Sequence, residues 1–445
     1  MMIVTLALNA CSPDIPPESY STSTPTIVQT PVLPTATPVT VKSPTPVSDA
    51  VTPDSTSTPA PVPTEHPITQ FFPDAELVYS PTSIGFDTAE YLQTVDGYLN
   101  SYRQYLMITG WTSAADIVSR VAWENSINPR LLLALLEYQS GAVLGQPPDP
   151  ENYLNALGAV DYYRSDLYGQ LTWAVRALSN GFYGWREGTL TEISFSDGTI
   201  FRPLPESNAG SVALQYYFAQ FDDHALWERS LDPNQGFFTQ YASMFPGAWQ
   251  HAQTVEPLIP DDLRQPSLNL PFEVGKTWAL TGGPHPAFEG NGPFAALDFA
   301  PSMNESGCVP SNAWAVAMAD GLVVRSDQGV VIQDLDGDGY QQTGWVLMYV
   351  HLAEQDLVSE GTFLSSGQKI GHPSCDGGRA TGTHLHVARK YNGVWITADS
   401  AVPFVLDGWI AHAGAKSYLG KLTRGDEVVT AHQFGSFISK ITRDE

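Results

Sequence analysis

Proline is the feature that most limits how this chain of 445 residues can fold. Fourteen of its 35 prolines fall between Ser12 and Pro67, where they are interleaved with serine and threonine. Such a segment cannot bury enough apolar surface to offset its ordering entropy, and its prolines favour an extended chain. We therefore expect a disordered Pro/Ser/Thr linker, or stalk, over residues 12–70, with folded domains only after it.

The remaining sequence changes its periodicity near residue 270. Apolar runs typical of helices, such as Leu131–Leu136, occur between residues 84 and 255. From residue 270 to 445, short β-rich runs such as Trp345–Val350 are separated by glycine and aspartate turns. This change predicts a multidomain α+β protein with a helical middle domain and a C-terminal antiparallel β-sheet domain.

The net charge excludes one class of partner. The chain has 47 acidic and 21 basic residues, a formal charge of -26, which disfavours binding to nucleic acid. In residues 68–270, 23 acids against nine arginines leave a net charge of -14, with no lysine. Recognition of an anionic polymer by this segment would gain little from electrostatic attraction. No stretch reaches the roughly 18 apolar residues of a spanning helix, so membrane contact is expected only through a lipid anchor.

The N-terminus carries a candidate anchor. The first residues are mostly apolar and run into Leu8-Asn9-Ala10-Cys11, which resembles a bacterial lipobox with a cysteine that is lipidated. The usual basic residues are absent and Asn9 is atypical, so a short frayed terminus is the alternative. On the lipobox interpretation residues 1–11 are a lipoprotein-type signal remnant. The protein would then be extracytoplasmic, lipid-anchored at Cys11 or secreted.

Two cysteines remain besides Cys11, namely Cys308 and Cys375. A free thiol outside the cell is readily oxidised, so export favours a disulfide between them. Two buried, unpaired cysteines are the alternative for a protein that stays in the cytosol.

Histidine is concentrated in the C-terminal domain, where five of the ten lie between His285 and His386. His384 and His386 flank one leucine, and side chains two apart on a strand share a face. His351 ends a β-rich run, and Asp298 follows His285 by thirteen residues. Imidazole and carboxylate are zinc ligands, and a catalytic zinc commonly has three of them and one open position. These residues therefore indicate metal-assisted hydrolysis.

The order of these motifs is specific. Gly282-Gly283-Pro284-His285, Asp298-Phe299-Ala300, Tyr349-Val350-His351-Leu352 and Gly382-Thr383-His384-Leu385-His386 resemble the lysostaphin-like, LytM-type zinc endopeptidases, which cut peptide cross-links in bacterial peptidoglycan. The long spacing between the first histidine and the aspartate is similar to that of the β-lytic metallopeptidase branch. The resemblance covers about residues 270–417.

The resemblance implies a role for each motif residue. One zinc ion would be held by three ligands: His285, Asp298 and His386. His351 and His384 would be the catalytic pair that deprotonates the zinc-bound water and stabilises the tetrahedral intermediate. Tyr349, placed on the strand face of His351, would assist them or simply pack.

The function that follows from the resemblance is hydrolysis of peptide cross-links or stem peptides of peptidoglycan. We expect the enzyme to act as a monomer. The alternative is a non-hydrolytic lipoprotein that binds the cell wall or activates other hydrolases.

The middle domain carries a weaker resemblance. Ile127–Gly141 resembles the active-site helix of lysozyme-like lytic transglycosylases, in which a glutamate directly before a serine is the general acid. Gln139 holds that place before Ser140, and an amide cannot donate and recover a proton. Glu137 lies on a different helix face. We expect a non-catalytic, lysozyme-like domain over residues 84–255 that binds glycan, with a plain helical spacer as the alternative.

An acidic run suggests a second cation. Asp334, Asp336 and Asp338 begin like the calcium loop of an EF-hand, but Trp345 stands where a bidentate glutamate is needed. The run therefore predicts a hairpin turn, with a calcium loop as the alternative.

Overall fold

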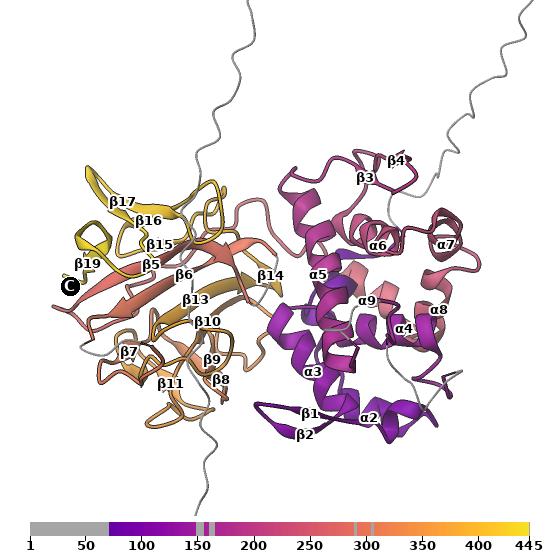
Figure 1. Cartoon of the computed structure of the whole chain (residues 1–445), viewed down its shortest axis with the longest axis horizontal. Helices are drawn as coiled ribbons and strands as arrows, with labels where there is room; N and C mark the ends of the chain where they lie inside the picture. Colours follow the sequence, from indigo (N-terminus) through magenta and orange to yellow (C-terminus); the bar gives the residue numbers. More distant parts are fainter. Residues whose placement is uncertain (1–70, 148–154, 160–164, 289–291, 304–306, 445) are drawn as a thin grey trace, which may run out of the picture. The chain divides into compact units, whose positions relative to one another are not determined.

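The computed structural model describes residues 71–147, 155–159, 165–288, 292–303 and 307–444 (Figure 1). The predicted lipobox with Cys11 and the proline-rich linker lie outside the described residues. Residues 65–445 form one compact unit. Helices dominate the first part of this unit and antiparallel strands dominate the second part. This order confirms the helical middle region and the C-terminal antiparallel β-sheet domain that the change in periodicity predicts.

The helical region begins at residue 74 and ends at residue 255. Its α-helices are α1 (Asp74–Leu77), α2 (Thr88–Gln93), α3 (Ala114–Asn125), α4 (Pro129–Ser140), α5 (Leu167–Arg186), α6 (Ala209–Ala219), α7 (His224–Ser230), α8 (Phe237–Met244) and α9 (Ala248–Val255). Short hairpins join some of them: β1 (Arg103–Leu106) with β2 (Gly110–Ser113), and β3 (Ile193–Ser194) with β4 (Ile200–Phe201). Among the described residues, no helix is long and apolar enough to cross a membrane.

The bounds of α4 follow from its capping residues. Asn128 accepts a hydrogen bond from the Arg130 backbone at the N-terminus, and Pro129 occupies the first turn, where no amide hydrogen is needed. Gly141 ends the helix in the left-handed conformation, with φ 66°. Every apolar side chain from Leu131 to Leu136 is buried, so this helix lies in the centre of the helical core.

The C-terminal domain is built on one large antiparallel sheet. Within the described part of the chain it has nine strands in the order β11-β8-β9-β10-β13-β6-β5-β19, with β14 paired to β13 (Figure 1). The strands are β5 (Thr277–Pro286), β6 (Phe294–Pro301), β8 (Gly321–Asp327), β9 (Val330–Asp334), β10 (Trp345–Val350), β11 (Phe363–Leu364), β13 (Leu385–Tyr391), β14 (Val394–Trp395) and β19 (Lys440–Thr442).

Two smaller sheets accompany it. β7 (Ala315–Val316) pairs with β12 (Lys369–Gly371), and the four-stranded sheet consists of β15 (Val405–Leu406), β16 (Trp409–Ala413), β17 (Gly420–Arg424) and β18 (Glu427–Thr430). A 3-10 turn, η5 (Phe437–Ser439), leads from this sheet into β19.

Alternation along β13 separates the two faces of the large sheet. Leu385 and Val387 belong to the apolar core of the β domain, whereas Ala388 belongs to the core that includes the helices. Side chains alternate along a strand, so His386 points to the same face as Ala388. One face of the sheet thus carries the motif histidine at one end and packs against helices further along.

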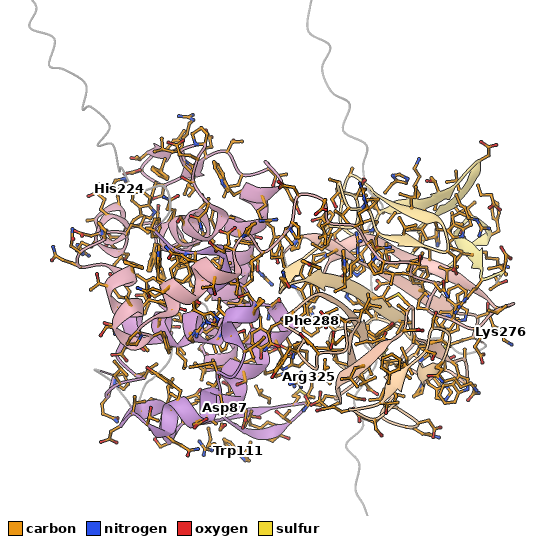
Figure 2. The ribbon with its side chains drawn as sticks, turned by 180° about the vertical axis from the view of Figure 1, so that it is seen from behind. Asp87, Trp111, His224, Lys276, Phe288 and Arg325 are labelled. Carbon is orange, nitrogen blue, oxygen red and sulfur yellow. A yellow bond between two sulfur atoms is a disulfide. The ribbon has the colours of Figure 1, made fainter. Side chains whose placement is uncertain are left out.

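Helix α3 and the residue that follows it contact the β domain directly. The Trp123 ring lies 6.2 Å from the Phe288 ring and 4.3 Å from the Arg325 guanidinium carbon, and Figure 2 labels both of these partners. Ser126 Oγ donates a hydrogen bond of 2.7 Å to the Gly393 carbonyl oxygen. The helical region is therefore joined to the sheet by aromatic, cationic and hydrogen-bonding contacts.

Lys390 is buried where these parts meet. Its ammonium nitrogen lies 5.4 Å from the Trp395 ring and 5.8 Å from the Tyr79 ring, and it donates to Gln341 Oε1 at 3.4 Å. Burial, with a smaller contribution from the charge of Arg325, lowers the pKa of Lys390 to about 7. Keeping this side chain protonated therefore costs folding free energy.

Replacing Lys390 with methionine is expected to stabilise the protein. In the unfolded chain the pKa of this lysine is near 10.5. The free-energy cost of burying the charged side chain is therefore complete below pH 7 and disappears as the pH rises from 7 to 10.5. At pH 7 we expect Lys390→Met to raise the free energy of unfolding by on the order of 2–4 kcal/mol and to flatten its pH dependence in that window. Denaturant unfolding at pH 7 and 9.5 measures both, with the exposed Lys421→Met as control. A variant less stable than wild type at pH 7 would contradict this account.

A disulfide closes a long loop of the β domain. The sulfur atoms of Cys308 and Cys375 are bonded, with Cα atoms 5.4 Å apart and a sequence separation of 67 residues. Loop-closure entropy for that separation corresponds to at most about 4 kcal/mol. We expect the double variant Cys308→Ala/Cys375→Ala to lose roughly 2–4 kcal/mol of unfolding free energy. Unfolding midpoints that do not change on reduction of the wild type would argue against this contribution.

Candidate metal centre

Three neighbouring strands carry the candidate metal ligands. Asp298 on β6 pairs directly with His386 on β13, and on its other side it pairs with Gly282 of β5. A register shift after Gly282 pairs His285 with Ala296, two residues from Asp298 and on the same face of β6. A Cβ atom at residue 282 would lie 2.5 Å from Asp298 Oδ2, so this close approach requires glycine.

The three ligand atoms form a nearly regular triangle. His285 Nε2 lies 3.0 Å from His386 Nδ1, and each of these nitrogens lies 3.2 Å from Asp298 Oδ1. Ligands at about 2.0 Å from a tetrahedral zinc ion are about 3.3 Å from one another. The distances therefore fit one zinc ion with three protein ligands.

Hydrogen bonds on the far side of each imidazole prepare it for a metal. His285 Nδ1 lies 2.8 Å from the Gly283 carbonyl oxygen, and His386 Nε2 lies 2.9 Å from the Ala287 carbonyl oxygen. A carbonyl only accepts, so these nitrogens carry the hydrogens. His285 Nε2 and His386 Nδ1 then present lone pairs toward each other and toward Asp298, as ligands of a cation do.

Burial and neighbouring charges set the protonation of this group. Burial alone would raise the pKa of Asp298, but His285, His386 and His384 outweigh it and hold the pKa well below its ordinary value. Burial lowers the pKa of His386, although its hydrogen bond to Asp298 acts in the opposite direction. An ionised carboxylate is the form of Asp298 that binds a metal ion.

Two further histidines lie beside this triangle. The His351 and His384 rings have centroids 4.4 Å apart. His351 Nδ1 lies 2.9 Å from the Asp376 carbonyl oxygen, and His384 Nδ1 lies 2.8 Å from the Gly382 carbonyl oxygen. Both rings therefore leave Nε2 free to accept a proton. Burial, and then the neighbouring His384 and His386, lower the pKa of His351 to about 3, so it is neutral at pH 7.

All five motif residues line one cavity of about 1140 Å³. The structure therefore brings together the three predicted ligands and the two predicted catalytic histidines. The arrangement offers a cation site, two histidines beside it that can transfer protons, and space for a substrate, which are the requirements for metal-assisted hydrolysis.

Tyr349 does not share the face of His351, and that expectation is wrong. Tyr349 is fully buried in the core of the β domain, where its hydroxyl donates to Gln333 Oε1 at 2.9 Å and accepts from the Met318 backbone at 2.9 Å. His351 follows the end of β10 and has φ 67°, so the alternation of the strand no longer applies to it. Tyr349 therefore packs and does not assist the site.

The motifs did not indicate Tyr418. Its ring stacks on His285 with centroids 4.2 Å apart, and it lines the cavity. Tyr418 has φ 69° and lies between Gly414 and Gly420, where added Cβ atoms would approach other backbone atoms within 2.7 Å. Two glycines around one aromatic residue were the available signal for a tightly folded loop.

The acidic run forms the turn between β9 and β10. Asp334 accepts backbone hydrogen bonds from Gly339 at 2.9 Å and from Asp336 at 3.1 Å, and burial raises its pKa to about 6. One oxygen from each of Asp334, Asp336 and Asp338 lies within 4.8 Å of the others. The hairpin turn is thus present, and calcium binding stays a prediction.

The transglycosylase-like segment Ile127–Gly141 shows no cluster of side chains that could hold a metal ion among the described residues. Glu137 accepts the backbone hydrogens of Val143 and Leu144 at 3.0 and 2.8 Å, so its carboxylate holds the loop after α4. The side-chain nitrogen of Gln139 is buried. The Glu137 side chain therefore supports the fold, and glycan binding by this region stays a prediction.

Two protein-family models match separate parts of the chain, one over the helical region and one within the β domain. Residues 70–257 match the model of the LasA N-terminal domain, and residues 308–398 match peptidase family M23. His285 and Asp298 precede the second match, which contains the other three motif histidines.

Two curated relatives are similar to parts of the chain. Protease LasA of Pseudomonas aeruginosa is 26% identical over 289 residues, which cover 62% of this chain and 66% of LasA, just under two thirds of that relative. The beta-lytic metalloendopeptidase of Lysobacter enzymogenes is 26% identical over 127 residues, or 28% of this chain and 70% of the relative.

Solved structures also resemble parts of the chain. The M23 metalloprotease pseudoalterin has 20% identity and a TM-score of 0.32, covering 38% of this chain and 96% of pseudoalterin. A zinc-containing peptidase from Vibrio cholerae has 21% identity and a TM-score of 0.20, covering 33% of this chain and 39% of that protein.

Proposed function

We propose, from the match of residues 308–398 to peptidase family M23, that the protein is a zinc-dependent endopeptidase that hydrolyses peptide cross-links or stem peptides of bacterial peptidoglycan. One observation carries the proposal. The donor atoms of His285, Asp298 and His386 lie 3.0–3.2 Å apart, with both imidazoles held in the tautomer that binds a metal. A domain that only binds the cell wall has no need of this triangle or of two further histidines beside it.

Zinc held by these three residues would lower the pKa of a water molecule and polarise the peptide carbonyl. The Nδ1 atoms of His351 and His384 are held by backbone carbonyl oxygens and both rings line the cavity, where one Nε2 can accept the proton of the attacking water. The carbonyl oxygens behind the rings fix their orientation.

The substrate is inferred from the motif order and from the relatives. The resemblance to peptidoglycan endopeptidases and the similarity to a beta-lytic metalloendopeptidase support a cell-wall peptide. The lipobox-like N-terminus supports an extracytoplasmic site of action. We propose that the helical region contributes wall binding through glycan contacts, since Gln139 stands where a general acid would be required for glycan cleavage.

Digestion of purified peptidoglycan by the full chain tests the proposal. Mass spectrometry of the soluble fragments should reveal new amino and carboxyl ends in the peptides while the glycan linkages stay intact. New glycan ends would assign the activity to the helical region instead. Protein that sediments with peptidoglycan and releases no fragments would support the wall-binding alternative.

A further inference from the structure

The cavity extends from the metal centre toward an edge of the large sheet. Lys440 on the edge strand β19 pairs with Ala279 of β5, which pairs with Ala300 of β6 (Figure 1). Directly paired residues share a face, and Ala300 lies two residues from Asp298 on the same strand, so this row belongs to the face of the metal centre. Lys440, Ala279 and Ala300 all line the cavity. Small side chains thus form the floor of a groove that crosses the strands.

The register sets the length of this groove. Leu385 of β13 pairs with Phe299 of β6, so the neighbouring Ala300 lies beside His384. Lys440 is then three strands away from His384, or about 14 Å at roughly 4.8 Å per strand. An extended peptide rises about 3.4 Å per residue, so about four residues span this distance.

Two aromatic side chains stand over the same groove. Phe434 and Phe437 line the cavity, and each is 85% exposed. The chain between them packs against Ala279, since a Cβ atom at Gly435 would lie 3.4 Å from the Ala279 Cβ atom, and it therefore forms one wall of the groove. Exposed rings at the wall of a cavity are available for apolar contact with a bound chain.

The charge of the groove is opposite to that of the whole protein. The chain has a net charge of -26, yet among the described residues that line the cavity the only acid is Asp298, a candidate metal ligand, whereas two cations, Arg379 and Lys440, line it. Lys440 is exposed and forms no ion pair with any residue that the structure describes. A cation placed at the end of such a groove favours an anionic group on the occupant.

We propose that this groove binds the substrate peptide in an extended conformation, and that Lys440 pairs with a carboxylate located about four residues from the cleaved bond. The substrate class is thus a peptide that carries an acidic group at that distance. Lys440 determines specificity and takes no part in the chemical step. This inference rests on the proposed peptidase function and adds the requirement for a carboxylate.

The test compares two forms of one substrate. Peptidoglycan freed of attached polymers is used either native or with its carboxyl groups amidated. For the full wild-type chain we expect amidation to raise the half-saturating substrate concentration about fivefold, the upper range for one exposed ion pair, with little change in maximal rate. Lys440→Gln should show the raised value on both substrates. Lys440→Arg should restore the preference for native peptidoglycan, which a merely structural role would not predict.

Lys276 supplies the matched control. It is exposed on the same sheet, next to the start of β5, and is labelled in Figure 2, but it does not line the cavity. Lys276→Gln should leave both the rate and the preference unchanged. A wild-type enzyme that digests both forms equally well, or a Lys440→Gln variant that keeps the preference, would overturn the inference while the peptidase function stands. Digestion of neither form by the zinc-loaded wild type would overturn the proposed function itself.

Discussion

His384→Ala is expected to retain a full zinc ion per chain and to cleave peptidoglycan about 10²- to 10⁴-fold more slowly than wild type. His384 is not part of the triangle of donor atoms, and its Nε2 is 3.7 Å from Asp298 Oδ1. Its Nδ1 is held by the Gly382 carbonyl oxygen, so Nε2 is directed to the cavity as a proton acceptor. Removing the ring therefore removes a base and leaves the ligands in place.

The measurement is the initial rate of peptide-end formation by metal-loaded protein, with zinc content determined on the same sample. His412 provides the control, because it lies on β16, outside the described lining of the cavity, and bonds Thr423 Oγ1 at 2.8 Å. His412→Ala should digest peptidoglycan normally. A zinc-loaded His384→Ala variant with the wild-type rate would show that the role assigned to this histidine is wrong.

His386→Ala is expected to lose both zinc and activity. His386 Nδ1 is one of three ligand atoms, and the ring is fixed by the Ala287 carbonyl oxygen behind it. Two protein ligands rarely retain zinc against dialysis, since catalytic sites commonly use three. We expect less than about one tenth of the wild-type zinc content and no rise in unfolding temperature when zinc is added.

The two variants together separate binding from chemistry. Wild type and His384→Ala should both be stabilised by added zinc, whereas His386→Ala should not. Full zinc occupancy in His386→Ala would contradict the ligand set. Zinc loss in His384→Ala would instead move that residue from the catalytic pair to the ligands.

The sequence was most informative where chemistry depends on local spacing. His384 and His386 are two residues apart on one chain segment, so alternation alone places both on one face. The helix from Pro129 to Ser140 follows from local preferences, since proline and glycine mark its ends. The resemblance to lysostaphin-like peptidases, carried by the ordered motifs, is confirmed by the family match of residues 308–398.

The remaining features depend on contacts that local spacing does not encode. The pairing of Asp298 with His386 and the shifted register before His285 arise from strands far apart in sequence. Tyr349 was misplaced because the strand ends one residue before His351. Tyr418 stacks on His285 from a loop outside the motifs. Tertiary packing, which decides each of these positions, has no periodic signature.

Lys390 illustrates the same limit for electrostatics. Its sequence neighbours on β13 predict a strand, but only the contacts with Trp395 and Tyr79 reveal that its ammonium group is buried. The position of Lys440 at the end of the groove likewise follows from the pairing of β19 with β5, strands that are more than 150 residues apart. The sequence alone assigns no role to either lysine.

A zinc titration of the metal-free full chain tests the central claim most directly. Purified peptidoglycan is incubated with protein stripped of metal, and new peptide ends are counted as zinc is added. We expect almost no cleavage without zinc and a rate that rises to saturation at one zinc per chain. A metal-free chain that cleaves at the full rate, or a zinc-loaded chain that produces no new peptide ends, would contradict it.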